Sequence, residues 1–207
     1  MTSNSAISET ATVKTQLILL GTGTPNADPD RSGPSLAIVV GDTSYIVDFG
    51  PGVVRRAASL SQKQGGSFEA LNPDNLKIAF LTHLHSDHTA GYADLILTPW
   101  VLGRSEPLKV FGPKGVKRMT EKIIDAYDED INYRIQGLEP ANENGWKVNV
   151  NEIDEGLIYT DDHVQVTAFR INHGTWDHAF GYKFVTPDKT IVISGDTAPS
   201  KKLIEMT

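Results

Sequence analysis

The chain has 207 residues, no cysteine and a formal net charge of −7 at neutral pH. This length allows one substantial domain with a buried core, and the lack of cysteine excludes disulfides and thiolate metal ligands. The surplus of acidic side chains does not favour a nucleic-acid partner, because nucleic-acid binding usually selects a basic surface.

The chain begins with a polar segment, Met1 to Gln16, that lacks the apolar centre of a signal peptide. We expect a disordered leader over residues 1–15 and a single folded domain over residues 16–207. No apolar run approaches the length of a membrane span. These features favour a cytoplasmic protein that does not contact a membrane.

Apolar runs of strand length alternate with amphipathic segments along the rest of the chain. Strands are predicted at 16–20, 35–40, 44–49, 77–82, 107–111, 147–153, 164–170, 180–186 and 190–194. Helices are predicted at 52–63, 89–98, 114–128 and from about residue 199. The glycine-, proline- and asparagine-containing stretch 129–146 predicts a connection within the domain.

The strongest chemical signal follows the strand at 77–82. Here the pattern HxHxDH places four side chains with metal-binding atoms within six positions, namely His83, His85, Asp87 and His88. Zinc, manganese and iron accept imidazole and carboxylate ligands. On a strand end His83 and His85 would point the same way, and a tight turn would direct Asp87 and His88 toward a second position. A merely solvated loop is disfavoured, because three of the six histidines in the chain lie in this segment.

Two further side chains stand at predicted strand ends. His173 follows the alternating run 164–171, and Asp196 follows the apolar run 190–194 and Gly195. A lone histidine beside a strand is often surface decoration, and Asp196 could instead cap the helix expected from about residue 199. The spacing gives His178 no role as a metal ligand. We give equal weight to two interpretations, a contact to the substrate or to a residue beside the metals, and simple surface exposure. His163 is expected to be solvated in a turn.

Taken in order, these motifs resemble the metallo-β-lactamase superfamily. They are LLGTGTP, YIVDFGPG, THLHSDHTAGYADL, the isolated His173 and VISGDT, and together they span nearly all of the chain after the leader. The resemblance implies an α+β fold, a four-layered αββα sandwich with the metals at one edge. Relatives continue beyond the GDT motif and supply another histidine to the second metal, so we expect a domain that lacks its C-terminal part.

The resemblance also implies a role for each site residue. His83, His85 and His173 would hold the first of two divalent ions, Asp87 and His88 the second, and Asp196 would bridge them. Zinc is favoured over manganese or iron. The nucleophile would be a hydroxide shared by the ions, which Asp87 would also orient as the catalytic residue. Asp48 would buttress the metal loop.

Substrate class is the harder question, since such a centre suits several kinds of ester. The GPKG motif at 112–115 resembles the branch that holds ribonuclease Z and arylsulfatase-like hydrolases, and DRSGPS and GPGVVRR favour the arylsulfatase-like side. The prediction is therefore a binuclear hydrolase of a small anionic ester, an aryl sulfate or a phosphodiester. Arg31, Arg55 and Arg56 could bind the anion, although such arginines more often form a solvated face.

Two alternatives remain open. One is a ribonuclease Z-like endonuclease that processes tRNA 3′ ends, and the other is a metal-binding domain without catalysis, which the missing last histidine would favour. A homodimer is also compatible with the sequence.

Overall fold

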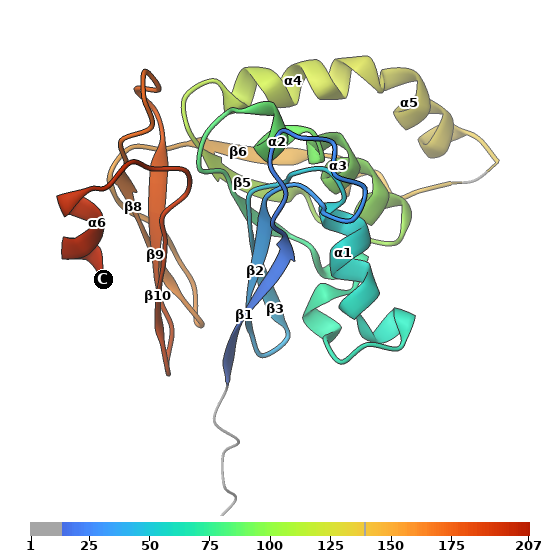
Figure 1. The fold of residues 1–207 in the computed structure, drawn as a ribbon. Helices are drawn as coiled ribbons and strands as arrows, with labels where there is room; N and C mark the ends of the chain where they lie inside the picture. Colours follow the sequence, from blue (N-terminus) through green and yellow to red (C-terminus); the bar gives the residue numbers. More distant parts are fainter. Residues whose placement is uncertain (1–13, 139) are drawn as a thin grey trace, which may run out of the picture.

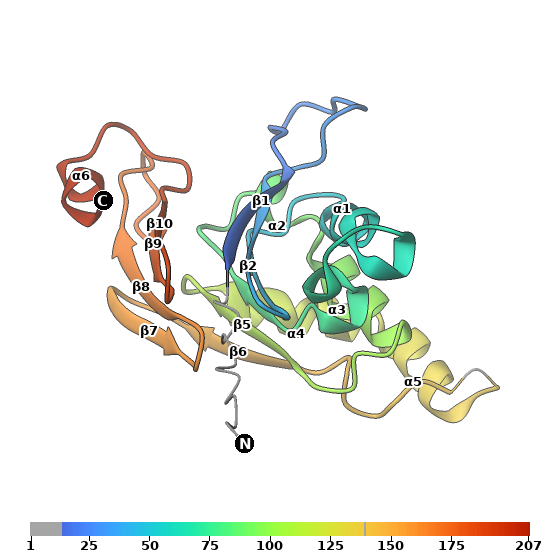
Figure 2. The ribbon, with the colours of Figure 1, turned by 90° about the horizontal axis from the view of Figure 1, so that it is seen from below.

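The computed structural model describes residues 14–138 and 140–207. It contains two β-sheets that face each other, with helices on both outer sides (Figures 1 and 2). The first sheet has the order β1-β2-β3-β4-β5-β6, antiparallel from β1 to β3 and parallel from β3 to β6. Its strands are β1 (Thr15–Gly21), β2 (Ser35–Val40), β3 (Thr43–Val47), β4 (Ile78–Phe80), β5 (Leu108–Gly112) and β6 (Val148–Glu152).

The second sheet is antiparallel and has the order β10-β9-β8-β7. Its strands are β7 (Gly156–Thr160), β8 (Gln165–Arg170), β9 (Phe180–Val185) and β10 (Thr190–Ile193). The helices are α1 (Val53–Leu60), α2 (Ser86–Thr89), α3 (Tyr92–Val101), α4 (Val116–Ala126), α5 (Asp128–Gln136) and α6 (Lys201–Met206). Three short 3₁₀ turns, Gln62–Gln64, Glu69–Leu71 and Pro73–Asn75, follow α1.

Most residues of the central strands are apolar on both sides of the strand, as expected for a sheet that is covered on both faces. In β2, Ala37 and Val39 pack into the core beneath α1, α3 and α4, whereas Ile38 and Val40 pack into the core between the sheets. A third cluster, which includes Phe169, joins the second sheet to α6. The layers therefore run helix, sheet, sheet, helix, which confirms the predicted αββα sandwich.

Asp161 joins the two sheets through hydrogen bonds. Its carboxylate accepts from the hydroxyls of Tyr45 in β3 (2.7 Å) and Tyr159 in β7 (2.8 Å) and from the backbone N–H groups of His163 and Val164. Burial alone would raise the pKa of Asp161, but these four donors outweigh it and lower the pKa below its ordinary value. The charged form of Asp161 therefore stabilises the packing of one sheet on the other.

We expect Asp161→Asn to lower the free energy of unfolding at pH 7 by about 1–3 kcal/mol, because it replaces a charged acceptor. A depressed folded-state pKa gives stability above the unfolded-state pKa of about 3.9, and this stability is lost as the pH falls through the folded-state value. Urea unfolding at pH 7 and pH 3 should show the deficit at pH 7 and a smaller one at pH 3. The exposed neighbour supplies the control Asp162→Asn, and equal stability of both variants at pH 7 would contradict the assignment.

The structure corrects several predicted elements. Residues 129–146 are not all connection, because α5 occupies Asp128–Gln136; its acidic first turn and the Arg134–Asp130 ion pair stabilise a helix that has little apolar periodicity. The strand β7 was missed. The predicted strand 77–82 ends at Phe80, and the predicted helix 89–98 is divided into α2 and α3.

The predicted leader falls almost entirely on residues 1–13, outside the described residues. Thr15, its last residue, opens β1, where it is buried and its backbone N–H donates to the Asp188 carboxylate. In the described part of the chain, no helix has the length and apolar character required to cross a bilayer.

Candidate metal centre

The polar side chains of interest follow four strands of the two sheets. Asp48 comes directly after β3, His83 after β4, His173 after β8 and Asp196 after β10. Strands β3 and β4 are parallel neighbours, so their carboxyl ends lie at the same edge of the first sheet. The facing second sheet contributes its residues to the same place. This edge of the sandwich gathers the histidines.

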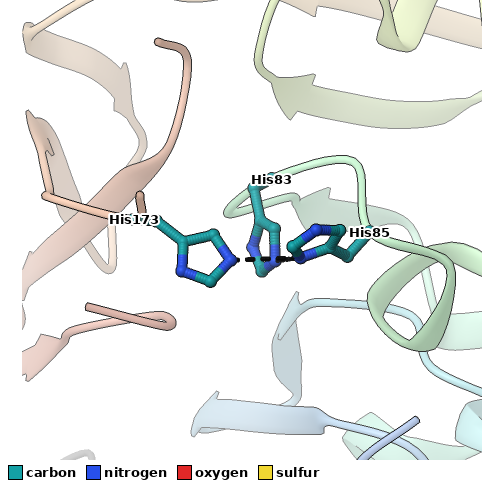
Figure 3. Close-up of side chains that lie close together, drawn as sticks. All are labelled: His83, His85 and His173. Carbon is teal, nitrogen blue, oxygen red and sulfur yellow. Dashed lines mark hydrogen bonds between the residues drawn. The ribbon is translucent and has the colours of Figure 1, made fainter. Parts of the chain in front are cut away.

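Three imidazoles converge at this edge (Figure 3). His85 Nδ1 lies 2.9 Å from His83 Nε2 and 3.1 Å from His173 Nε2. A tetrahedral zinc ion with Zn–N bonds of about 2.0–2.1 Å separates its nitrogen ligands by roughly 3.3 Å. The three nitrogens are thus spaced nearly as a single metal ion requires, and His83, His85 and His173 could hold one.

His83 is fully buried. Burial, followed by the neighbouring His88, His173 and His85, lowers the pKa of His83 to about 3. His83 is therefore neutral at physiological pH, which is the form that binds a metal.

A second group lies beside the first and consists of His83, His88 and Asp196, with ligand atoms within 4.8 Å of one another. His88 Nε2 is 3.5 Å from Asp196 Oδ2 and 3.7 Å from Asp87 Oδ2. This nitrogen is buried and has no hydrogen-bond partner among the described residues. A buried acceptor that faces two carboxylates is unfavourable without a cation. These residues fit a second metal ion, and Asp196 lies where it could serve both positions.

Asp48 determines which nitrogen of His88 is available. Asp48 Oδ2 lies 2.8 Å from His88 Nδ1, so the imidazole donates there and leaves the Nε2 lone pair free. The same carboxylate accepts from the backbone N–H of Thr82 (2.8 Å) and from the Thr82 hydroxyl (2.9 Å). The Thr82 oxygen lies 3.0 Å from His83 Nδ1 and can accept its proton, which leaves His83 Nε2 free as well. One buried carboxylate therefore orients a histidine of each metal position.

The electrostatic surroundings of His88 favour a cation. Burial alone would lower the pKa of His88, but the hydrogen bond to Asp48 and the charges of Asp48, Asp196 and Asp87 outweigh it, and the pKa is raised. The same negative charges that attract a proton also attract a metal ion, so proton and metal compete for His88 Nε2.

All six predicted ligands meet at this edge: His83, His85, Asp87, His88, His173 and Asp196. Asp87 and His88 were predicted to lie in a tight turn. They lie instead on the short helix α2, which begins at Ser86. Asp196 does not cap α6, since the Ser200 hydroxyl accepts from the Leu203 N–H there.

His178 does not join either group of ligand atoms in the described chain. The backbone of His163 is held in a turn by Asp161. The sequence analysis did not identify two residues that contact the candidate ligands. One is Thr82, and the other is Trp176, whose indole N–H donates to His85 Nε2. The role of Thr82 could have been inferred from its position directly before His83. Nothing in the spacing of the sequence indicated a contact of Trp176 with the site.

A cavity of about 330 Å³ opens beside Asp87. Its walls are α2 and the loop between β1 and β2, including Asp28 and Arg31. Arg31 is largely exposed and lies 3.7 Å from the Asp28 carboxylate. Arg55 and Arg56 line two neighbouring hollows on α1. Of the three arginines considered in the sequence analysis, only Arg31 therefore lines the cavity that contains Asp87.

Residues 43–206 match the β-lactamase superfamily domain. The chain is 33% identical over 194 residues to the ribonuclease Z of Mycobacterium marinum, which covers 92% of this chain and 66% of that protein. A ribonuclease Z of Mycobacterium bovis is 32% identical with the same coverage. The chain thus spans just under two thirds of the length of these relatives.

Solved structures show the same fold. The short form of human tRNase Z superposes with a TM-score of 0.70 at 21% sequence identity. The superposition covers 92% of this chain and 73% of the human chain. The metallo-β-lactamase fold protein YhfI from Bacillus subtilis superposes with a TM-score of 0.66 at 14% sequence identity. This superposition covers 91% of this chain and 65% of the YhfI chain. At these identities the likeness concerns the fold alone.

Proposed function

This chain belongs to the metallo-β-lactamase superfamily, and from that premise we propose that it is a two-metal hydrolase of the ribonuclease Z type that cleaves a phosphodiester bond in precursor tRNA. The observation that carries the proposal is the pair of adjoining ligand groups, which share His83 and meet at one sheet edge. The relatives named ribonuclease Z support the choice of substrate.

Each residue has a separable role in this proposal. His83, His85 and His173 would hold the first divalent ion, Asp87 and His88 would hold the second, and Asp196 would be a ligand shared by both. When bound, such ions polarise a phosphate oxygen and lower the pKa of a water molecule between them. Asp87, at the wall of the cavity, would accept a proton from such a water molecule and orient it toward the phosphorus. Asp48 keeps His88 and, through Thr82, His83 in their metal-binding tautomers.

The comparisons favour the ribonuclease Z alternative over the small anionic ester that the sequence suggested, and they give no support to an arylsulfatase. The net charge of −7 is a property of the whole chain, and single cationic side chains still lie at and near the cavity beside Asp87. Arg31 lines the cavity beside Asp87, and Arg55 is largely exposed on α1. A guanidinium group can donate two parallel hydrogen bonds to the oxygens of one phosphate, which suits the phosphates of an RNA backbone.

We test the proposal with the zinc-loaded chain and three substrates: a precursor tRNA with a 3′ trailer, a bis-aryl phosphate and an aryl sulfate. Cleavage at the trailer is expected, together with a slower reaction of the bis-aryl phosphate. Asp87→Ala should lower the rate at least about 100-fold, since it removes a proton acceptor and a metal ligand. The matched control is Asp42→Ala, in the exposed turn between β2 and β3.

Two results would contradict the proposal. Hydrolysis of the aryl sulfate alone would restore the small-ester prediction, and metal binding without cleavage of any substrate would favour the non-catalytic alternative.

A further inference from the structure

Three cationic side chains gather where α4 begins. Lys114 lies in the turn that leads into the helix, Lys117 and Arg118 lie in its first turn, and all three are exposed. The inner side of this end of α4 is fixed by the buried side chains of Val116 and Thr120. The cations therefore stand on the solvent side, and we refer to Lys114, Lys117 and Arg118 as the α4 cation cluster.

The α4 cation cluster does not stabilise its own helix. The N-terminus of a helix carries a partial positive charge, so cations in the first turn oppose the helix dipole. The first turn of α4 contains no acidic residue, whereas the first turn of α5 contains three. The Glu152 carboxylate of β6 accepts from the N–H groups of Gly115 (2.6 Å) and Lys117 (3.3 Å), so a distant segment supplies the acidic group that α4 lacks. A local rule that is broken without a gain in stability points to a role in binding.

The α4 cation cluster also lacks ion pairs. Among residues 14–138 and 140–207, none of its three side chains pairs with a carboxylate. One turn further along the helix, by contrast, Lys122 pairs with Asp125 at 2.8 Å. Glu121 follows the cluster on α4 without reaching a cation at that distance. Neighbouring unpaired cations repel one another, and an anionic ligand would relieve this repulsion.

The α4 cation cluster lies at the same edge of the sandwich as the histidines. Strand β5 is the parallel neighbour of β4, so the turn that follows β5 emerges beside His83. The two segments touch, because a Cβ placed on Gly115 would lie 2.9 Å from Leu84 Cδ1, and Leu84 stands between His83 and His85. Arg31, in the loop between β1 and β2, lies on the β1 side of β4, whereas β5 lies on the other side. Cations therefore stand on both sides of the candidate metal centre.

We propose that the α4 cation cluster binds backbone phosphates of the RNA substrate on the side of the scissile bond away from Arg31. An RNA strand that crosses this sheet edge meets Arg31, the metal centre and the cluster in turn. Phosphate contacts fix the position of a nucleic acid without reading its sequence, so the cluster contributes affinity and alignment. The inference rests on the proposed function and adds a site where the substrate is held.

The salt dependence of tRNA binding by charge-matched variants tests the cluster. The cluster variant carries Lys114→Gln, Lys117→Gln and Arg118→Gln. The control variant loses the same charge at the opposite edge of the sandwich, where three lysines directly precede β4, β6 and β10, through Lys77→Gln, Lys147→Gln and Lys189→Gln. Both variants and their parent also carry Asp87→Ala, so that fluorescence anisotropy measures the binding of labelled precursor tRNA without cleavage.

The cluster variant should bind precursor tRNA about 10- to 100-fold more weakly than the parent at about 0.1 M salt. The slope of log affinity against log salt concentration should become less steep by roughly two to three, the value for three lost phosphate contacts. The control variant should stay within about twofold of the parent, because its lysines lie at the opposite edge and their field is screened.

Urea unfolding separates a loss of binding from a loss of structure. Because the cluster opposes the helix dipole, the cluster variant should unfold at the same urea concentration as the parent or a higher one. A lower midpoint would show that the three cations support the fold, and would overturn the inference. Equal affinity and equal salt slope of the two triple variants would also overturn it, and would leave the proposed function standing if the wild-type chain cleaves precursor tRNA. A parent that binds no precursor tRNA would overturn both.

Discussion

Asp48→Asn should weaken zinc binding roughly 10- to 100-fold, the usual effect of removing a group that orients a metal ligand. The asparagine amide would donate to His88 Nδ1, so the proton of His88 would move to Nε2, the nitrogen that faces Asp87 and Asp196. The second ion would then lose its histidine without any change in the ligand residues themselves.

Asparagine is the suitable replacement because Asp48 has a φ of 60°, in the left-handed region that asparagine tolerates well. The backbone should therefore stay in place, and the loss can be assigned to the tautomer. Competition with a chromophoric chelator measures the affinity of both ions. Asp42→Asn, at the exposed turn before β3, should bind zinc like the wild type, and an Asp48→Asn variant with wild-type affinity for both ions would refute the role of Asp48.

Arg104→Met should destabilise the fold by roughly 3–5 kcal/mol, near the upper end of single substitutions. Arg104 is 1% exposed, and its guanidinium donates to the carbonyls of Leu76, Leu95, Ile96 and Gly145. Methionine is similar in length but leaves these carbonyls buried without donors. They belong to the middle of α3 and to the loops before β4 and β6, so the loss should loosen the helix-covered side of the first sheet.

Urea unfolding followed by circular dichroism measures this effect as a lower midpoint with an unchanged slope. The control is Arg56→Met on the exposed side of α1, where a change within about 0.5 kcal/mol is expected. If both variants unfold at the same urea concentration, the carbonyls around Arg104 do not depend on its side chain.

The cluster of candidate ligand side chains and the layered fold could be predicted from the sequence because their signals are local. HxHxDH places its candidate ligands within six consecutive positions, and β2 to β4 show the apolar runs of strands buried on both faces. The helix α5 could not be predicted from periodicity, since only Ile131 is buried along it. Its stability comes from charge rather than from an apolar stripe.

Contacts between segments that are distant in the sequence could not be predicted from the sequence. Trp176 and His85 are separated by 91 positions, and Asp48 and His88 by 40, so only the packed sheets show that they meet. The direction of the Asp48 carboxylate also depends on a left-handed backbone that no pattern indicates.

The central claim is that one sheet edge holds two metal ions on the side chains described above. Native mass spectrometry of the wild-type chain, purified without chelator and supplied with zinc, measures the number of ions per chain. We expect two ions in the wild type and one in His88→Ala, because that variant leaves His83, His85 and His173 intact. A wild-type chain that binds no zinc, or a His88→Ala variant that still binds two ions, would contradict the claim.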